Sequence, residues 1–195
     1  MTTLKELTLG GTVLPIARWG RPVMHAKTRR VTVFDDTLHA LIRDMFATMV
    51  AAEGVGLAAT QVGVDLALFV FDCPDDDHVR HVGVVCNPEV RLPEGKERVL
   101  ESTDEGCLSL PGAYIELARP DKATCTGQDA FGHPIEIVGS GLLARCLQHE
   151  TDHLNGTVFG DRLPARSRKK LFRLHEAVAD SYPDDWPVTP RSVSE

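Results

Sequence analysis

Hydrophobic residues between positions 35 and 53 recur at the spacing of one helical face. They fall at i, i+3, i+4 and i+7, the pattern of an amphipathic α-helix that buries one side. The members of this stripe are Leu38, Leu41, Ile42, Met45, Phe46, Met49 and Val50. Asp35 or Asp36 can cap the first turn, and Gly54 can end the helix. The pattern predicts an N-terminal helix whose methionines belong to the core.

From residue 64 to residue 139 the pattern changes to short runs rich in β-branched and aromatic residues. Turn-forming residues separate these runs, which is typical of antiparallel strands. The predicted strands cover residues 66–72, 79–86, 96–101, 113–118, 121–127 and 134–138. The acidic run Asp75–Asp77 is expected at the solvated tip of the first hairpin.

Two further helices are predicted after the strands. One covers residues 141–155, and the other begins near Pro164, because proline suits the first helical turn, and runs to about Asp180. A helix, then strands, then helices indicate an α+β fold with antiparallel β-sheets rather than alternating βαβ units. We expect a single domain over residues 1–180. The prolines of residues 181–195 predict a disordered C-terminal tail.

Composition and charge are those of an ordinary soluble protein. Hydrophobic residues make up 43% of the chain and charged residues 25%. No stretch approaches the ~20 apolar residues that cross a bilayer, and no signal-peptide run opens the chain, so we expect a cytoplasmic protein without membrane contact. The formal net charge of −7 argues against sequence-specific or general nucleic-acid binding. Five scattered cysteines favour reduced thiols over a disulfide framework.

His149, Glu150 and His153 form an H-E-x-x-H motif within the predicted helix 141–155. Histidines four residues apart lie on one face of an α-helix, with Cβ atoms about 5–6 Å apart, and can hold one divalent metal ion. Glu150 projects roughly 100° away from His149, beside such an ion rather than bound to it. A metal ion, a water and a carboxylate base are typical of a hydrolytic metalloenzyme.

The motif leaves the third metal ligand open, since catalytic sites usually use three protein ligands and one water. His175 and Glu176 lie downstream, as third ligands often do in zinc peptidases. Cys107 lies upstream in a loop-like segment, and Cys146 shares a helical face with His149 at i, i+3. A thiolate with two neutral imidazoles would leave a divalent ion with a net positive charge, which still acidifies bound water.

Three segments together resemble the signature motifs of the peptide deformylases, in the same order along the chain. They read GVGLAATQVG over residues 54–63, EGCLSLPG over residues 105–112 and QHETDHLNG over residues 148–156. The resemblance spans about residues 10–165. It implies a metal-dependent enzyme that removes the formyl group from the initiator formyl-methionine of nascent polypeptides and releases formate.

The resemblance also implies the ligands and the metal. It selects Cys107, together with His149 and His153, as the metal-binding residues. In the cell such enzymes typically use Fe²⁺, and they tolerate Ni²⁺, Co²⁺ or Zn²⁺. Ligand identity alone does not separate iron from zinc, because imidazole and thiolate suit both ions.

Further roles follow from the same resemblance. Glu150 is the general base, and the side-chain amide of Gln61 and the backbone N–H of Leu108 stabilise the oxyanion. Glu105 is expected to steady the site by pairing with Arg119. The residues expected to contact substrate are Val55, Gly56, Arg145 and Cys146. Cys146 is alternatively a core residue beside the site.

Three positions depart from the family pattern. Thr60 stands where proline usually precedes Gln61, which predicts a looser loop around that amide. Tyr114 stands where many relatives carry a basic residue that touches the substrate backbone. Arg145 replaces an aliphatic residue of the methionine pocket; its stem can pack against methionine with the charge turned outward, or it narrows the side-chain preference.

A basic cluster follows the metal-binding helix on this otherwise acidic chain. Its members are Arg162, Arg166, Arg168, Lys169, Lys170 and Arg173. The cluster is either a solvated helix face or, as the resemblance suggests for C-terminal helices in some relatives, a ribosome contact. A contact of the second kind weakens steeply with salt.

Two other functions share parts of this pattern. A metallo-endopeptidase also uses H-E-x-x-H, but it requires a third ligand downstream of the motif. A catalytically weak relative that only binds formyl-methionyl peptides is the other alternative, and Thr60 is the one local hint for it. The residues that favour the deformylase are Gln61, Cys107, His149, Glu150 and His153.

Overall fold

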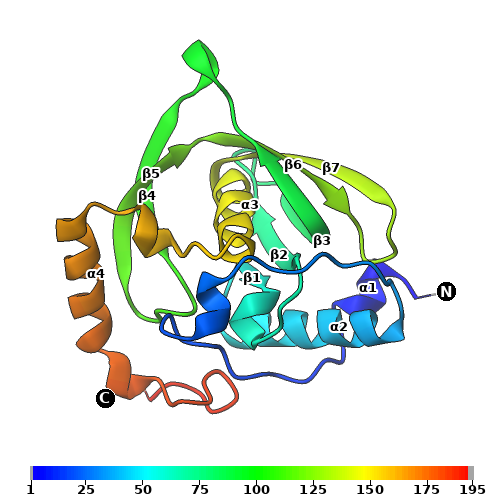
Figure 1. Ribbon diagram of the computed structural model, residues 1–195, viewed down its shortest axis with the longest axis horizontal. Helices are drawn as coiled ribbons and strands as arrows, with labels where there is room; N and C mark the ends of the chain where they lie inside the picture. Colours follow the sequence, from blue (N-terminus) through cyan, green and yellow to red (C-terminus); the bar gives the residue numbers. More distant parts are fainter. Residues whose placement is uncertain (1, 193–195) are drawn as a thin grey trace.

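A five-stranded antiparallel sheet forms the centre of the computed structural model, which describes residues 2–192 (Figure 1). Its strands, in spatial order, are β1 (Gly56–Ala58), β2 (Leu68–Pro74), β3 (Arg80–Arg91), β6 (Lys122–Gln128) and β7 (Pro134–Ser140). Each neighbouring pair is antiparallel. Strand β1 lies at one edge of the sheet, so one side of its backbone has no neighbouring strand.

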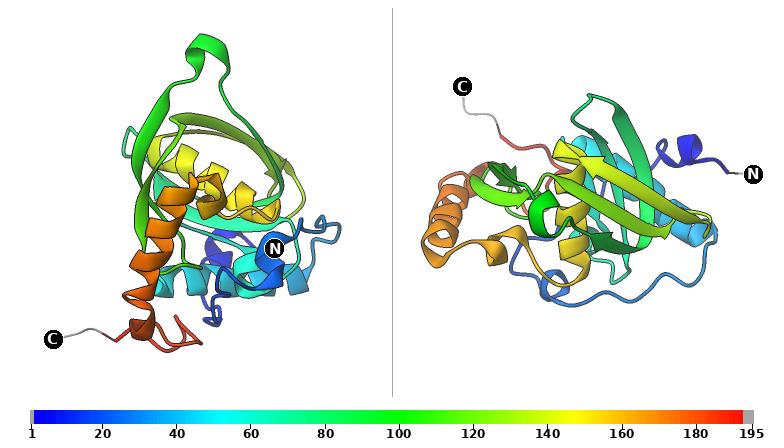
Figure 2. Two further views of the ribbon diagram at one scale, coloured as in Figure 1. Left: turned by 60° about the vertical axis from the view of Figure 1, so that its left-hand side comes forward. Right: turned by 90° about the horizontal axis from the view of Figure 1, so that it is seen from above.

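Strand β2 shows why the sheet is covered on both faces. Leu68 and Val70 belong to the cluster built around helix α2 (Asp36–Ala51), whereas Phe69 and Phe71 pack with helix α3 (Gly141–Leu154). Side chains alternate across a strand, so a continuous apolar run is buried on both sides. Helices α2 and α3 therefore lie on opposite faces of this part of the sheet, as both views show (Figures 1 and 2).

A second sheet carries the loop that approaches α3. It consists of β4 (Leu100–Gly106) and β5 (Tyr114–Pro120), with helix α4 (Ala165–Glu176) packed beside β5 (Figure 2). A separate buried cluster joins these parts, and it includes Leu110, Phe159 and Leu171. The short helices are α1 (Leu4–Leu7), η1 (Pro22–His25), η2 (Ala59–Val62), η3 (Gly95–Glu97), η4 (Phe159–Arg162) and η5 (Ala179–Ser181).

The predicted α+β class and the three principal helices are confirmed. Asp35 caps α2 by accepting a hydrogen bond from the Leu38 backbone N–H at 3.0 Å. Val50 is 66% exposed and does not belong to the core, in contrast to the rest of its stripe. The strand predicted over residues 96–101 begins only at Leu100, because Gly95–Glu97 forms the short helix η3, and it continues along β5 to Gly106. Asp75–Asp77 forms the turn between β2 and β3, as expected.

The segment after α4 packs on the protein rather than forming the disordered tail predicted from residue 181. Trp186 is 6% exposed within the α2 cluster, and the Tyr182 ring meets it edge-on at 5.2 Å. The Ile16 backbone N–H donates to the Trp186 carbonyl at 2.9 Å. Two aromatic anchors therefore outweigh the effect of the prolines, while residues 193–195 lie outside the described residues. Over the described part of the chain, no helix is long and apolar enough to span a membrane.

Candidate metal centre and active site

Helix α3 buries the H-E-x-x-H motif against the sheet. The rings of His149 and His153 meet across one helical turn, with their Nε2 atoms 3.2 Å apart. His153 is fully buried, and burial together with the neighbouring His149 lowers its pKa well below the usual value. His153 therefore favours the neutral imidazole, which is the form that binds metal ions.

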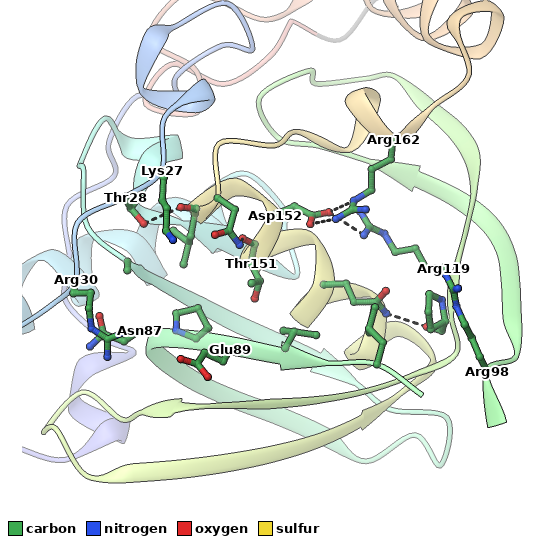
Figure 3. Close-up of a pocket in the computed structure, with 18 of the residues that line it drawn as sticks. Lys27, Thr28, Arg30, Asn87, Glu89, Arg98, Arg119, Thr151, Asp152 and Arg162 are labelled. Carbon is green, nitrogen blue, oxygen red and sulfur yellow. Dashed lines mark hydrogen bonds and ion pairs between the residues drawn. The ribbon is translucent and has the colours of Figure 1, made fainter. Parts of the chain in front are cut away.

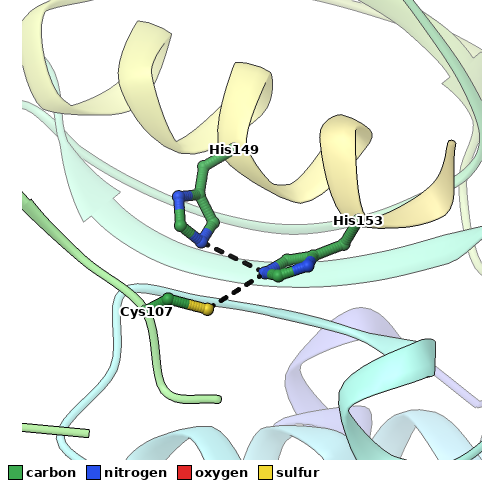
Figure 4. Close-up of side chains that lie close together, drawn as sticks. All are labelled: Cys107, His149 and His153. Carbon is green, nitrogen blue, oxygen red and sulfur yellow. Dashed lines mark hydrogen bonds between the residues drawn. The ribbon is translucent and has the colours of Figure 1, made fainter. Parts of the chain in front are cut away.

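Cys107 brings a sulfur atom to the two histidines. It directly follows β4, and its Sγ lies 3.3 Å from His153 Nε2. All three donor atoms lie within 4.8 Å of one another (Figure 4). A tetrahedral ion with bonds of about 2.0–2.3 Å separates two ligand atoms by about 3.3–3.6 Å, so this donor set fits one divalent ion.

The other candidates for the third ligand lie elsewhere. The ring of His175 hydrogen-bonds to a backbone carbonyl at 3.0 Å, and Glu176 is exposed. The Cys146 thiol donates to the Val55 carbonyl at 3.6 Å. Within residues 2–192, the histidine pair is joined by Cys107 and not by the downstream ligand that an endopeptidase requires.

A buried carboxylate, Glu105, orients the first histidine. Its Oε1 lies 2.8 Å from His149 Nδ1, and Arg119 donates to both carboxylate oxygens at 2.7 Å, which is the pairing expected from the resemblance. An ionised carboxylate only accepts hydrogen bonds, so His149 Nδ1 carries a proton and Nε2 is the nitrogen available to bind a metal. Burial alone would raise the pKa of Glu105, but the hydrogen bonds from Arg119 and His149 outweigh it and hold that pKa well below its usual range.

Arg145 also points toward Glu105, which corrects the expectation that its charge turns outward. Its guanidinium donates to Glu105 Oε2 at 2.8 Å, to the Leu117 carbonyl at 3.0 Å and to the Glu101 carbonyl at 2.9 Å. The residue is only 7% exposed. A charge buried to that extent requires partners, and the β4–β5 hairpin supplies a carboxylate and two carbonyls on the inner side.

Gln61 lies beside Cys107 on the short helix η2. The Ala58 backbone N–H donates to Gln61 Oε1 at 2.9 Å, and Gln61 Nε2 lies 3.7 Å from Cys107 Sγ. Thr60, which stands where proline usually precedes this amide, is fully buried within the turn. Gly63 ends this turn with φ 78°, a left-handed conformation that suits glycine. The turn thus forms without proline.

Glu150 lies next to the donor set without joining it. It is 4% exposed, and burial raises its pKa to about 7. A Cβ atom added to Gly56 would stand 2.5 Å from Glu150 Oε1 and 2.8 Å from Cys146 Sγ. The absent side chain of Gly56, the first residue of edge strand β1, therefore provides the space that the Glu150 carboxylate occupies.

Comparison with known proteins decides the family. Residues 13–169 match the sequence model described as polypeptide deformylase. The chain belongs to the polypeptide deformylase family. It is 54% identical over 174 residues to peptide deformylase 1 of Streptomyces avermitilis, an alignment that covers 89% of this chain and 80% of that protein. Peptide deformylase of Mycolicibacterium paratuberculosis is 47% identical, with 84% of this chain and 89% of that protein covered.

Solved structures agree. A peptide deformylase from Legionella pneumophila is 40% identical with a TM-score of 0.75, covering 85% of this chain and 95% of that one. A peptide deformylase from Synechococcus elongatus, solved in complex with actinonin, is also 40% identical with a TM-score of 0.72, covering 88% and 89% of the two chains. The family, fold and enzyme class predicted from the sequence are confirmed, and these matches support removal of the formyl group from nascent peptides. Members of this family depend on a metal ion.

A cavity of about 850 Å³ opens onto the donor set of this deformylase. Most residues that the sequence analysis expected at the active site line this cavity: Val55, Gly56, Gln61, Leu108, Arg145, Cys146 and Glu150. Glu105 and two of the three metal-binding residues, Cys107 and His149, line it as well. Tyr114, which is 63% exposed, also borders the cavity. Tyr182, Trp186 and Arg191 form another part of its wall, which the sequence analysis missed. The sequence feature that could have identified this part of the wall is the pair of aromatic residues in the proline-rich segment after α4.

Gly56→Ala is expected to lower turnover of a formyl-methionyl peptide by about 10²-fold, because the added methyl group displaces the Glu150 carboxylate by roughly 1 Å. Metal content should not change, because the added Cβ meets Glu150 and Cys146 rather than any of the three donors. Turnover and metal stoichiometry measured on the same preparation test this. Gly20→Ala is the control, because a Cβ there meets nothing within 4 Å. Equal turnover of both variants would contradict the steric role of Gly56.

Proposed function

We propose that this deformylase hydrolyses the N-formyl group of formyl-methionyl nascent peptides at a divalent ion held by Cys107, His149 and His153. The observation that carries the proposal is the convergence of one sulfur and two ring nitrogens within 4.8 Å, beside a buried carboxylate. When bound, such an ion acts as a Lewis acid that polarises the formyl carbonyl and makes a water molecule more acidic.

Glu150 is the proposed general base and acid. It accepts a proton from the attacking water and later delivers that proton to the departing methionine amine, so that formate leaves. Its burial and the glycine opposite it hold the carboxylate at the cavity wall. Proton transfer by one positioned side chain contributes about 10²–10⁴-fold to a rate.

Gln61 and Leu108 are the proposed donors to the developing oxyanion. The Ala58 N–H holds Gln61 Oε1, which leaves the amide NH₂ group on the side of Cys107 and Ser109. Leu108 follows the ligand Cys107 directly in the loop that lines the cavity, and its backbone N–H is the second donor. Losing one such donor typically costs about 10²–10³ in rate.

The substrate is proposed to bind as an added strand along β1. Val55 and Gly56 line the cavity, and β1 is the edge of its sheet, so its outer backbone groups can pair with an extended peptide. Cys146 and the aliphatic stem of Arg145 line the cavity near the methionine side chain. The guanidinium of Arg145 acts through Glu105, which it helps Arg119 to hold against His149.

Fe²⁺ is the proposed ion in the cell, on the basis of the family resemblance; the donors themselves suit iron and zinc alike. A nascent-chain substrate also supports the expectation that the protein works in the cytoplasm, where translation takes place. Elemental analysis of protein purified without oxygen from its own cells is expected to find iron at about one ion per chain. Zinc in its place would contradict the iron assignment while leaving the proposed ligands intact.

Glu150→Gln is expected to abolish formate release, because an amide accepts no proton from water, yet to retain the metal ion. Formate and free amine are measured with a formyl-Met tripeptide, and metal content is measured in parallel. Glu53→Gln, an exposed residue at the cavity border, is the matched control and should keep full activity. Residual turnover near that of the unchanged protein would show that another group is the base.

Helix α4 is proposed to contact the ribosome. Arg166, Lys169, Lys170 and Arg173 are exposed, whereas Arg168 lies 3.6 Å from Asp161. Within residues 2–192 these four cations have no ion-pair partner, and their position along one helix of an acidic protein supports binding to an RNA-rich surface.

Reversing Arg166, Lys169 and Arg173 to glutamate is expected to reduce co-sedimentation with ribosomes, most clearly at low salt, and to leave tripeptide turnover unchanged. The control reverses Lys5, Arg21 and Lys96, which are also exposed but lie outside α4. Equal sedimentation of the two triple variants would refute a specific role for α4.

A further inference from the structure

The chain after helix α4 forms a compact loop beside the catalytic cavity. This C-terminal loop covers residues 181–192, and its two ends meet where the Ser192 backbone N–H donates to the Ser181 carbonyl at 2.9 Å. Surface loops of this length whose ends are joined are compact elements that frequently serve a function. The loop lies outside residues 13–169, which match the family model. Its part in the cavity is therefore a feature that the family match does not describe.

Hydrogen bonds hold the C-terminal loop against the N-terminal segment, and Figure 1 draws the two side by side in red and blue. The Ile16 backbone N–H donates to the Trp186 carbonyl at 2.9 Å. The Arg18 guanidinium donates to the carbonyls of Tyr182 at 3.1 Å and Pro183 at 2.9 Å. It also lies 5.8 Å from the centre of the Trp186 ring, within reach of a cation–π contact. The loop therefore has a defined position at the cavity.

The same N-terminal segment also holds the backbone around both proposed oxyanion donors. The Ala17 N–H donates to the Gln61 backbone carbonyl at 2.8 Å, and the Trp19 N–H donates to the Ser109 carbonyl at 3.0 Å. Ser109 directly follows Leu108, whose backbone N–H is the second proposed donor. Hydrogen bonds to one short segment thus connect the C-terminal loop to the groups that face the formyl carbonyl, which fixes the loop relative to the reacting end of a substrate.

The ring of Tyr182 forms the part of the loop that meets the segment after Cys107. A Cβ atom added to Gly112 would stand 3.0 Å from Tyr182 Cε2 and 3.1 Å from its Oη. The ring can lie this close to the backbone because glycine has no side chain, and it meets the Trp186 ring edge-on at 5.2 Å. Tyr182 is therefore held between packed neighbours and lines the cavity in a fixed place.

The surface that the C-terminal loop presents to the cavity is largely apolar. The residues that it contributes are Tyr182, Trp186, Pro187, Pro190 and Arg191. Apart from Arg191, these are aromatic or proline rings. Rigid rings offer contact area without losing much side-chain entropy when a ligand binds. Such a wall suits apolar side chains of a peptide better than charged ones.

We propose that the C-terminal loop binds the residues that follow formyl-methionine and selects peptides with apolar side chains at these positions, with Tyr182 as the main contact. This inference rests on the proposed function. In that function the formyl group lies at the metal ligands and the methionine side chain lies near Cys146, so the rest of the peptide extends into the part of the cavity that the loop lines. An apolar side chain packed against Tyr182 leaves water, and the resulting stabilisation grows with the area covered.

Steady-state kinetics of the nickel-loaded enzyme test the proposal with three substrates: formyl-Met amide, formyl-Met-Gly-Gly amide and formyl-Met-Leu-Leu amide. The unchanged enzyme is expected to show a kcat/KM about 10-fold higher for the Leu-Leu peptide than for the Gly-Gly peptide, mainly through a lower KM. Tyr182→Ala should remove most of this preference. Tyr182→Phe keeps the ring and should retain the preference.

Val188→Ala is the matched control within the same loop. Its side chain is 48% exposed and does not line the cavity, so the preference should not change. Pro190→Glu provides a second test that leaves the core intact, because Pro190 is exposed and yet lines the cavity. The added carboxylate should lower kcat/KM for the Leu-Leu peptide by a few-fold and raise it for formyl-Met-Lys-Lys amide.

Three results would overturn the proposal. Equal kcat/KM of the unchanged enzyme for the Gly-Gly and Leu-Leu peptides would show that the loop selects no side chain. An equal loss in Tyr182→Ala for all three substrates, formyl-Met amide included, would show that the ring only supports the fold. Absence of formate from every substrate would refute the proposed function together with this inference, whereas the first two results leave the proposed function intact.

Discussion

The buried carboxylate of Glu105 is the interaction on which the rest of this structure depends. It receives hydrogen bonds from Arg119, Arg145 and His149, which join the β4–β5 hairpin to helix α3. Taking these charges out of water is costly, and only complete hydrogen bonding of the carboxylate offsets that cost. The same contacts fix the His149 ring with its Nε2 atom toward Cys107 and His153. The packing of the β4–β5 hairpin against α3 and the geometry of the metal site therefore depend on the same hydrogen bonds.

The covering of the sheet on both faces determines where this network can form. Because the side chains of β2 are buried on alternating sides, α2 and α3 must lie on opposite faces, and α3 lies inside the fold. A buried helix allows the motif residues His149 and Glu150 to line the cavity from inside the fold. Gly56 completes the arrangement, since the edge strand can approach Glu150 only where no side chain intervenes.

Helix α3 consequently presents two chemically different sides. Its front side carries the metal ligands and the base beside a cavity bordered by Tyr182 and Trp186. Its back side, with Thr151 and Asp152, lines a second cavity of about 550 Å³ (Figure 3). Asp152 and Glu105 share Arg119, so the two sides are connected by one guanidinium. Arg119 and Glu105 therefore hold residues of the H-E-x-x-H motif in place, and the sequence of the motif does not reveal either contact.

The sequence by itself determined the features that depend on local spacing. Periodicity alone predicted α2 and α3, and four-residue spacing was sufficient to bring His149 and His153 to one helical face. The family resemblance selected Cys107, which no local rule separated from Cys146 or His175. These features could be predicted because they depend only on helix geometry and on the order of the motifs in the sequence.

Only the tertiary structure decided what depends on distant segments. Arg145 turned inward because the β4–β5 hairpin offered Glu105 and two carbonyls, and β4 extends to Gly106 because it pairs with the distant strand β5 over its whole length. Trp186 anchored a segment whose prolines suggested disorder. Each outcome depends on which groups meet across the fold, and the energy of a buried charge or ring is set by those neighbours rather than by its own sequence position.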